Sequence, residues 1–338
     1  MGRPTMRDVA QRAGVSTKTV SNVARGWPPV SQQTEERVKA ALEDLGYRMN
    51  RSPRMLRTGR SGIIALAVPW LDSPYFAEIT SAIVRRAATL DLTVLVEQTD
   101  GLPEREQVVV QGLPGQPVDG LIFSPYALGE EDFAGRPMST PTVLLGERMG
   151  PRYGDHVAID NVAAAHDVVT HLIQIGRQRV AAIGHQSVPG AVTARQRARG
   201  YERALHAAGR PVDPALQLTV DSFHRADGAA AMRRLLASGR PFDAVFCFSD
   251  LLALGAMHEL KKAALRIPED VAIAGFDDIE EGRYTDPELT TIHPDKEQIA
   301  RVALDLLTSR LAAADDRGPD LRDVCPPYHL IVRGSTAR

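Results

Sequence analysis

The sequence predicts an α/β protein in which a small all-α headpiece precedes a core of two subdomains built on parallel sheets. Short amphipathic helical segments fill the first 45 residues, and from residue 62 onward short apolar runs alternate with amphipathic helical segments. Strand alternating with helix is typical of βαβ units. Because 338 residues exceed one ordinary domain, we expect a headpiece over 1–49, a hinge segment over 50–61 and a core over 62–338.

The composition is that of an ordinary globular protein. Apolar residues make up 43% of the chain and charged residues 24%, which excludes disorder, collagen and coiled coil as descriptions of the whole. The chain has no run of 18 apolar residues, and its start, MGRPTMRD, lacks the apolar segment of a signal peptide. We therefore expect a cytoplasmic protein without a membrane partner. Cys247 and Cys325 lack partners at metal-ligand spacing, and both are expected to be small buried side chains.

The net charge of −2 hides a strong asymmetry along the chain. Residues 1–60 carry twelve Lys and Arg against five acidic residues, a net charge of +7, whereas the remainder carries 28 against 37, a net charge of −9. Such a difference between two parts of one chain indicates a head that binds a polyanion and a body with another task.

Each predicted helix of the headpiece begins at a hydroxyl residue that can cap it. Thr5 precedes MRDVAQRA, with Asp8 at the position of a capping box. Ser16 precedes TKTVSNVA, and Ser31 precedes QQTEERVKAALEDL. Apolar residues at spacings of three and four give each helix one buried stripe. In the short turn between the first two helices, Gly14 can adopt a positive φ, which predicts a helix-turn-helix motif.

The second helix presents a polar face opposite its apolar stripe. Lys18 can donate to guanine, Asn22 can pair with adenine, and Thr17 can contact a base or a thymine methyl group. Short hydroxyl side chains suited to phosphate contacts are found at Ser16, Thr19, Ser21 and Ser31. The residues alone leave two alternatives, a DNA-binding motif and a three-helix packing module without a DNA partner.

A resemblance to a known family favours the first alternative. The stretch MRDVAQRAGVSTKTVSNVARG, followed by VSQQTEERVKAALEDLGYRMNRSPRMLRTGRSG, resembles the headpiece and hinge of the lactose-repressor (LacI/GalR) family of bacterial regulators. This resemblance implies that Thr17, Lys18 and Asn22 carry much of the base readout. It also implies a homodimer that binds double-stranded, pseudo-palindromic operator DNA.

The hinge segment is too short and too polar to hold a core of its own. Ser52 as N-cap and Pro53 at the first helical position predict a short helix up to about Thr58, and a helix of that length is marginal in isolation. In the family, two such helices pair in the DNA minor groove. Leu56 then corresponds to the leucine that wedges between base steps, and Pro53 differs from the small residue usual in this hinge.

Candidate ligand residues in the core follow from the predicted parallel sheets, which bind ligands beyond the carboxyl ends of their strands. Many polar residues at such ends only cap a helix or form a turn, and about one in three is expected to touch a ligand. The candidates are Asp72, Ser73, Tyr75, Thr99, Asp100, Ser124, Glu147, Ser249, Asp250, Asp277 and Asp278.

The core resembles the ligand-binding core of the same family, which is similar to periplasmic sugar-binding proteins with two α/β subdomains hinged around a cleft. The resemblance includes DLLALGAM, VAIAGFDD, PELTTIH and LIVRGST. It implies that Arg197 and Asp277 hold ligand hydroxyls, a role suited to a guanidinium donor and a carboxylate acceptor. Phe223 would stack on the ligand, and many members carry Asn at the position of Ser249. Tyr75, Ser124, Glu147 and Thr193 would complete the lining.

The expected function is that of a ligand-responsive transcriptional regulator, a repressor of sugar-utilisation genes. No G-x-S-x-G, Walker, H-E-x-x-H or G-x-G-x-x-G motif occurs, so an enzyme is not expected, and neither a cofactor nor a metal site is predicted. Purine-binding members have an extra arginine a few residues before the position of Arg197, a region in which this chain has Ala191, and this favours a sugar effector. The alternatives are a purine or nucleoside corepressor-type regulator and a sugar-binding transport component.

Overall fold

The computed structural model describes residues 4–23, 30–46, 60–133, 140–188, 190–313 and 320–337. The chain forms two compact units, Met1–Ser61 and Gly62–Arg338. The predicted hinge helix, with Ser52, Pro53 and Leu56, lies outside the described residues. No helix in the described part of the chain is long and apolar enough to cross a membrane.

The headpiece contains the three predicted helices around one apolar core. Val9, Val20 and Val38, one from each helix, are fully buried. The polar residues of the second helix therefore face outward while its valines face the core, as the helical periodicity predicts. The helices are α1 (Met6–Ala13), α2 (Thr17–Val23) and α3 (Gln32–Asp44).

The predicted caps and turn of the headpiece are confirmed. Thr5 and Asp8 form a reciprocal capping box, and the hydroxyl of Ser16 accepts a hydrogen bond from the Thr19 backbone N at 3.1 Å. Gly14 has a φ of +63° in the left-handed region, where glycine avoids the steric cost of a Cβ. Arg37 of α3 donates to the carbonyl of Gly14 at 3.2 Å, so the third helix also holds the turn that sets the angle of α2.

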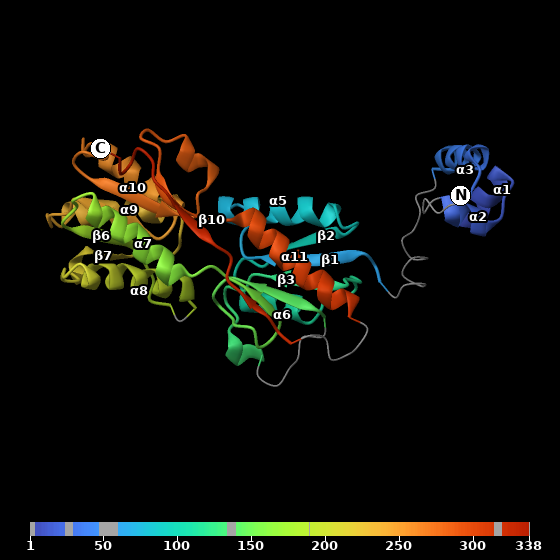
Figure 1. Cartoon of the computed structure of the whole chain (residues 1–338), viewed down its shortest axis with the longest axis horizontal. Helices are drawn as coiled ribbons and strands as arrows, with labels where there is room; N and C mark the ends of the chain where they lie inside the picture. The colour runs from blue at the N-terminus through green and yellow to red at the C-terminus, as the bar shows by residue number, and fades with distance from the viewer. Residues whose placement is uncertain are drawn as a thin grey trace. The chain divides into compact units, whose positions relative to one another are not determined.

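The first lobe of the core is built on a six-stranded parallel sheet with the strand order β11-β5-β4-β3-β1-β2. Helices α5 and α11 lie along this sheet (Figure 1). The strands are β1 (Ile63–Val68), β2 (Thr93–Gln98), β3 (Gly120–Phe123), β4 (Thr142–Leu145), β5 (Asp155–Val157) and β11 (Asp323–Val324), and the helices are α5 (Pro74–Ala88), α6 (Pro103–Val110), η1 (Glu130–Phe133) and α11 (Lys296–Ala312).

The second lobe is built on another six-stranded sheet, with the order β12-β10-β9-β8-β6-β7. Its edge strand β12 runs antiparallel to β10, a detail that the prediction of parallel sheets does not contain. The strands are β6 (Val180–His185), β7 (Gln217–Thr219), β8 (Ala244–Cys247), β9 (Ala272–Phe276), β10 (Thr290–Pro294) and β12 (Tyr328–Ile331), and the helices are α7 (Asn161–Gln174), α8 (Val192–Ala207), η2 (Pro214–Leu216), α9 (Arg225–Ala237), α10 (Asp250–Lys262) and η3 (Glu280–Arg283).

The chain passes between the two lobes at three places. These crossings lie between β5 and α7, between β10 and α11, and between β11 and β12. Each crossing has only a few residues, so the lobes can rotate relative to each other only about these short segments. The predicted fold class, two α/β subdomains hinged around a cleft, is confirmed.

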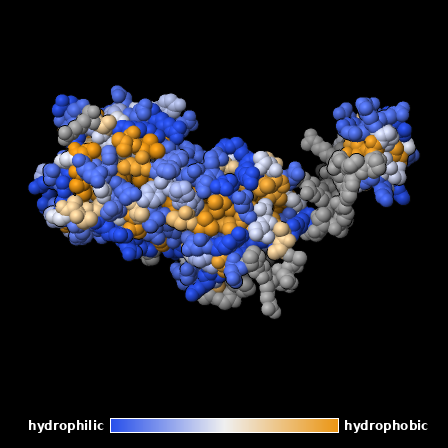
Figure 2. Space-filling view, in the orientation of Figure 1, coloured by the Kyte–Doolittle hydropathy of each residue, from blue (hydrophilic) through white to orange (hydrophobic). Residues whose placement is uncertain are grey.

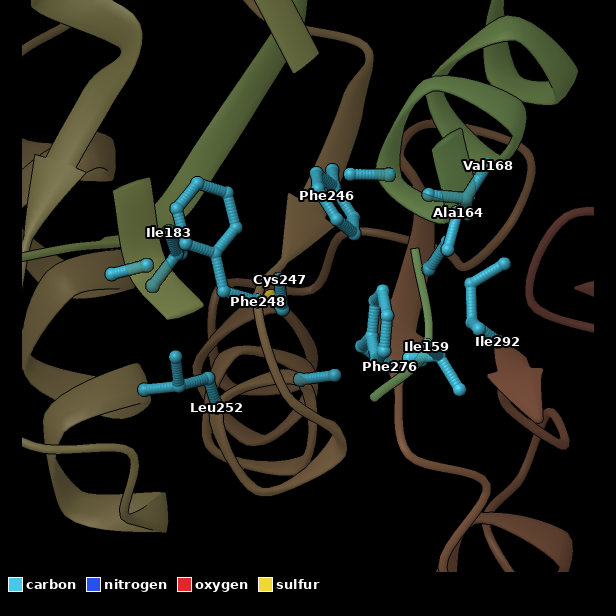
Figure 3. Packing of buried hydrophobic residues seen from close by; sticks show 14 of the residues in the cluster. Ile159, Ala164, Val168, Ile183, Phe246, Cys247, Phe248, Leu252, Phe276 and Ile292 are labelled. Carbon is cyan, nitrogen blue, oxygen red and sulfur yellow. The ribbon is translucent and has the colours of Figure 1, made fainter. Parts of the chain in front are cut away.

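The interior of the second lobe explains why its strands are continuous apolar runs. Every residue of β8 and β9 is buried, because helices cover both faces of the sheet. Figure 3 shows Phe246 of β8, Val168 of α7 and Leu252 of α10 among the buried side chains of one cluster. Cys247 belongs to this core as predicted, whereas the prediction that Cys325 is buried is wrong. Cys325 lies on the short third crossing, where its side chain is exposed to solvent.

The surface of the core is mixed in character. Figure 2 shows a mostly hydrophilic face with apolar residues gathered in patches over both lobes. Among the large apolar side chains that remain exposed are Val84 of α5 and Tyr284, which follows η3. Contiguous exposed apolar surface on a folded protein commonly marks a contact with a partner.

Two glycines bring helices α9 and α10 into backbone contact. A Cβ added to Gly255 would lie 2.0 Å from the carbonyl oxygen of Arg225, and one added to Gly228 would lie 2.2 Å from that of Leu252. The close packing fixes the N-terminal ends of both helices, where Phe223 and Ser249 precede them in the chain.

Substitution Gly255→Ala is therefore expected to destabilise the core. Overpacking of this kind costs about 1–3 kcal/mol, and the contact here is with backbone that cannot rotate away. Urea unfolding followed by circular dichroism measures the free energy of unfolding. The matched control is Gly150→Ala, whose added methyl group would meet only Glu130 Oε1 at 3.6 Å. Equal stability of the two variants would contradict the packing argument.

Candidate functional site

A cavity of about 180 Å³ lies between the two lobes of the core. Residues that follow β1, β3 and β4 in the first lobe and β8 and β9 in the second border it, as expected for parallel sheets. All eight side chains predicted to line a ligand site border this one cavity: Tyr75, Ser124, Glu147, Thr193, Arg197, Phe223, Ser249 and Asp277.

Other strand-end candidates serve the fold instead. Asp250 is fully buried in the second lobe, where Thr291 Oγ1 donates to it at 2.6 Å and the Ile279 backbone N donates at 3.0 Å. Asp100 pairs with Arg105 at the surface. Ser73 also borders the cavity, but Asp72, Thr99, Asp100, Asp250 and Asp278 do not.

Arg197 is a buried cation whose orientation is fixed by four neighbours. Its Nε donates to Asn161 Oδ1 at 2.8 Å, and its Nη1 donates to the carbonyl oxygen of Phe248. The guanidinium carbon lies 3.5 Å from the centroid of the Phe276 ring, and Nη2 lies 3.5 Å from Asp277 Oδ1. With only 8% of its side chain exposed, Arg197 is not a surface charge, although arginines flank it in the sequence.

Asp277 is a buried carboxyl in an unusual backbone conformation. Its φ is +112°, which aims the side chain at Arg197. Burial raises the pKa of Asp277 to about 6, against the opposing effect of the positive charges of Arg197 and Lys296. A carboxyl with this pKa is ionised at neutral pH and accepts hydrogen bonds from hydroxyl groups.

Glu147 connects the two lobes through the wall of the cavity. It follows β4 in the first lobe, and its carboxylate accepts hydrogen bonds from Thr193 Oγ1 at 2.7 Å and from Asn161 Nδ2, both in the second lobe. Asn161 in turn accepts the hydrogen bond of Arg197. A continuous chain of charge-assisted hydrogen bonds, which are the stronger kind, therefore runs from one lobe to the other along the cavity.

Ser249 has a structural role besides its place at the cavity. Its hydroxyl oxygen accepts a hydrogen bond from the Leu252 backbone N at 3.3 Å and so caps α10. The hydroxyl proton is still able to donate. The predicted capping and the predicted place in a ligand site are thus compatible.

Sequence reasoning missed an aromatic wall of the cavity. Trp70 and Tyr126 lie with ring centroids 4.6 Å apart in an edge-to-face arrangement, and Phe76 lies 6.3 Å from Trp70. Gly101 makes room for this pair, because a Cβ there would lie 2.8 Å from Tyr126 Cδ1. Trp70 and Tyr126 both lie a few residues beyond strands, so a search of strand ends for aromatic as well as polar residues would have found them. Asn161, at the start of a helix, gave no such signal.

The predicted DNA-contacting face of the headpiece is exposed. Ser16, Thr17, Lys18 and Ser31 are exposed, and Thr19, Ser21 and Asn22 are partly exposed. The hydroxyl groups of Ser16 and Ser31 already cap α2 and α3.

Comparison with known proteins identifies the family. Residues 5–50 match the family described as bacterial regulatory proteins, lacI family, and residues 169–336 match a periplasmic binding protein-like domain. The HTH-type transcriptional repressor CytR of Escherichia coli (strain K12) is 33% identical over 98% of this chain and 96% of its own length. The chain belongs to the LacI family. A second relative, the HTH-type transcriptional repressor PurR of Haemophilus influenzae (strain PittEE), is 32% identical over 98% of each chain.

Solved LacI-family structures confirm the fold. The lac repressor dimer bound to operator and the anti-inducer ONPF has a TM-score of 0.82 and 26% identity, with both chains fully covered. The regulator CelR in complex with cellobiose has a TM-score of 0.72 and 31% identity, over 98% of this chain and all of that one. A LacI-family regulator from Sanguibacter keddieii is 41% identical, with a TM-score of 0.76, over 82% of this chain and all of its own. The protein is thus a DNA-binding transcriptional regulator and not an enzyme.

The raised pKa of Asp277 makes the stability of the core depend on pH. Because the folded-state pKa, about 6, exceeds the ordinary value of 3.8, the favourable contribution of this carboxyl is fully present below about pH 4 and is lost as the pH rises through 6. Asp277→Asn removes that dependence. Between pH 4 and pH 7.5 the difference in free energy of unfolding between variant and wild type should shift in favour of the variant by about 2 kcal/mol. Urea titrations at both pH values measure it.

The control for this pH dependence is Asp72→Asn, an exposed carboxyl outside the cavity, which should follow the wild type at both pH values. A difference between Asp277→Asn and wild type that stays constant from pH 4 to pH 7.5 would contradict the raised pKa.

Proposed function

We propose that this LacI-family protein represses sugar-utilisation genes and that a sugar bound between the lobes changes its affinity for operator DNA. The observation that supports the ligand class is the buried Arg197–Asp277 pair beside Glu147 in one cavity. Carboxylate oxygens accept hydrogen bonds from hydroxyl groups and a guanidinium donates to them. Phe223 and Trp70 line the same cavity and supply apolar aromatic surface for the apolar side of a sugar.

A nucleoside is the second candidate effector. The aromatic wall of Trp70, Phe76 and Tyr126 could stack on a planar base, while the carboxylates accept hydrogen bonds from ribose hydroxyls. Against this candidate, the region a few residues before Arg197, where purine-binding members have an extra arginine, has the buried Ala191 in this chain. The structural neighbour CelR was solved with cellobiose, which also favours a sugar.

The effector acts by selecting one arrangement of the two lobes. Glu147 accepts hydrogen bonds from the second lobe at the same place where a ligand would donate its own. A ligand that binds one lobe arrangement more tightly shifts the population toward it, and only this difference in affinity can change operator binding. We propose that the segment over 50–61, with Leu56 in the minor groove, carries the change from the core over 62–338 to the headpiece over 1–49.

The protein acts as a homodimer on a pseudo-palindromic operator in the cytoplasm, where the chromosome lies. Two headpieces related by two-fold symmetry require two related half-sites. The lac repressor neighbour is a dimer on its operator, and exposed apolar residues such as Val84 and Tyr284 leave surface that a second copy could cover. The DNA-contacting head makes a transport component the least suitable of the alternatives.

Thermal-shift screening with sugars and nucleosides tests the ligand class. A compound that binds only the native state raises the melting temperature, by an amount that grows with its concentration above Kd. We expect a sugar to raise it and to change operator affinity in a gel shift. Asp277→Ala should abolish both effects while operator binding without effector persists. A rise with nucleosides alone would replace the sugar by the second candidate, and an unaltered response of Asp277→Ala would remove Asp277 from the site.

Lys18→Ala tests the role of α2. If Lys18 donates to guanine in the major groove, its loss should weaken specific operator binding by about 1–3 kcal/mol. Gel shifts against a selected palindromic duplex, at one fixed salt concentration, measure the change. Lys39→Ala is the matched control, because Lys39 is an exposed cation of α3 that pairs with Glu35 at 2.7 Å. Operator affinity that is the same for both variants would exclude Lys18 from base readout.

A further inference from the structure

A second cavity, of about 280 Å³, lies at the crossing from β10 to α11. It shares no lining residue with the effector cavity. Its walls come from α5 of the first lobe, from the segment after β9 in the second, and from the start of α11. Nearly all of its lining side chains are charged or titratable, which distinguishes it from the aromatic-walled effector cavity.

Lys296 is the buried cation of this second cavity. Its Nζ lies 2.7 Å from Glu78 Oε2 of α5, and its side chain is only 9% exposed. The same Nζ donates to the carbonyl oxygen of Asp278 at 3.0 Å and lies 6.0 Å from the centroid of the Tyr75 ring. Lys296 therefore contacts both lobes from the first residue of α11.

Glu78 is held by groups from two elements outside α5, through an ion pair with Lys296 and a backbone hydrogen bond. Besides the Lys296 ammonium group, the backbone N of Glu280 in η3 donates to Glu78 Oε1 at 3.1 Å. One turn earlier on the same helix, Tyr75 borders the effector cavity. The position of α5 at this junction is thus set by groups that belong to the second lobe and to the crossing.

Asp277 and Asp278 face the two different cavities from adjacent positions. Both have positive φ values, +112° and +44°, and Asp277 borders the effector cavity while Asp278 borders the second cavity. Asp278 is held by Arg333 at 2.5 Å, by Arg283 at 3.0 Å and by His293 at 2.9 Å. Although burial raises its pKa, the hydrogen bonds from His293 and Arg333 and the arginine charges keep the pKa of Asp278 well below the usual value. The turn is consequently stiff on the side that faces Lys296.

We propose that Lys296 is a positioning residue that couples Asp277 of the effector cavity to helix α5 of the first lobe. The coupling runs from Asp277 through the adjoining peptide to the Asp278 carbonyl, then through the Lys296 ammonium group to Glu78 and Tyr75. A change at Asp277 shifts the acceptor of Lys296, and because the Lys296 side chain is only 9% exposed, its ammonium group cannot exchange Glu78 for water without cost. This inference rests on the proposed effector role of the first cavity.

The test is a double-mutant cycle that needs no ligand. Hydrogen exchange, measured by mass spectrometry on the full chain, reports the opening of α5 over residues 74–80. In the wild-type background, Asp277→Asn should change this exchange by about threefold or more, the low end of coupling energies found along such networks. In the Lys296→Met background the same substitution should leave α5 unchanged.

Two further variants keep the test decisive. Lys296→Arg retains the charge and should retain the coupling. If Lys296 only filled space, Lys296→Met would retain the coupling equally well. If Lys296→Met does not fold, Glu78→Gln removes the other end of the ion pair and should abolish the coupling in the same way. The matched control is Lys262→Met, which removes an exposed ammonium group from its pair with Glu259 within α10 and should leave the effect of Asp277→Asn on α5 intact.

The outcomes separate this inference from the proposed function. The coupling would be overturned if Asp277→Asn did not change the hydrogen exchange of α5 in the wild-type background. It would also be overturned if the change were equal in the wild-type and Lys296→Met backgrounds. Operator affinity of the wild-type protein and its response to sugars are measured separately. If the protein bound no operator, or if no sugar changed that binding, the proposed function would be wrong. The hydrogen-exchange result would still decide whether Lys296 couples the Asp277–Asp278 turn to α5.

Discussion

The hydrogen-bonded chain of Glu147, Asn161 and Arg197 is the interaction on which the behaviour of the core depends. Glu147 belongs to one lobe, while Asn161, Thr193 and Arg197 belong to the other. These groups are largely withdrawn from water, where hydrogen bonds to charged groups are strong and unpaired ones are costly. Any movement of the lobes must therefore break or replace this chain, and a hydroxyl-rich ligand brings the groups that can replace it.

The same arrangement explains why the site lies where it does. Strands of both sheets end at the cavity, so each lobe supplies only part of the polar lining, and the three short crossings keep these parts in register. Asp277 is held in a conformation that few residues adopt, and its burial raises its pKa. The backbone strain and the burial of this carboxyl both lower the stability of the folded protein. A cost of this kind is expected at a site arranged to bind a ligand.

Much of the fold and part of the site could be predicted from local rules. Caps at Thr5, Ser16 and Ser31 are local features of sequence, and the alternation of strand and helix predicts parallel sheets. The rule that ligands bind beyond strand ends, together with the family resemblance, selected eight candidates that all line one cavity. It also selected Asp250, which serves the fold, since a strand-end carboxyl does not reveal whether its partners are protein or ligand.

What could not be predicted depends on contacts between distant segments. Asn161 matters because it contacts both Glu147 and Arg197. Lys296 matters because Glu78, more than 200 residues earlier in the chain, faces it. The spacing of residues along the sequence does not indicate such contacts. Trp70 and Tyr126 were missed for another reason, since the search considered only polar side chains. The antiparallel strand β12 and the exposed Cys325 reflect the last crossing, whose path is set by packing of the whole core.

The distance between the lobes tests the central claim most directly. Spin labels at Glu104→Cys in α6 and Arg203→Cys in α8, both exposed, with Cys325→Ser to remove the exposed native thiol, report this distance by pulsed electron paramagnetic resonance. If the Glu147 chain holds the lobes, Glu147→Ala should broaden or shift the distance distribution, while Ser124→Ala, at the same cavity, should leave it unchanged. A distribution identical in all three proteins would contradict the account.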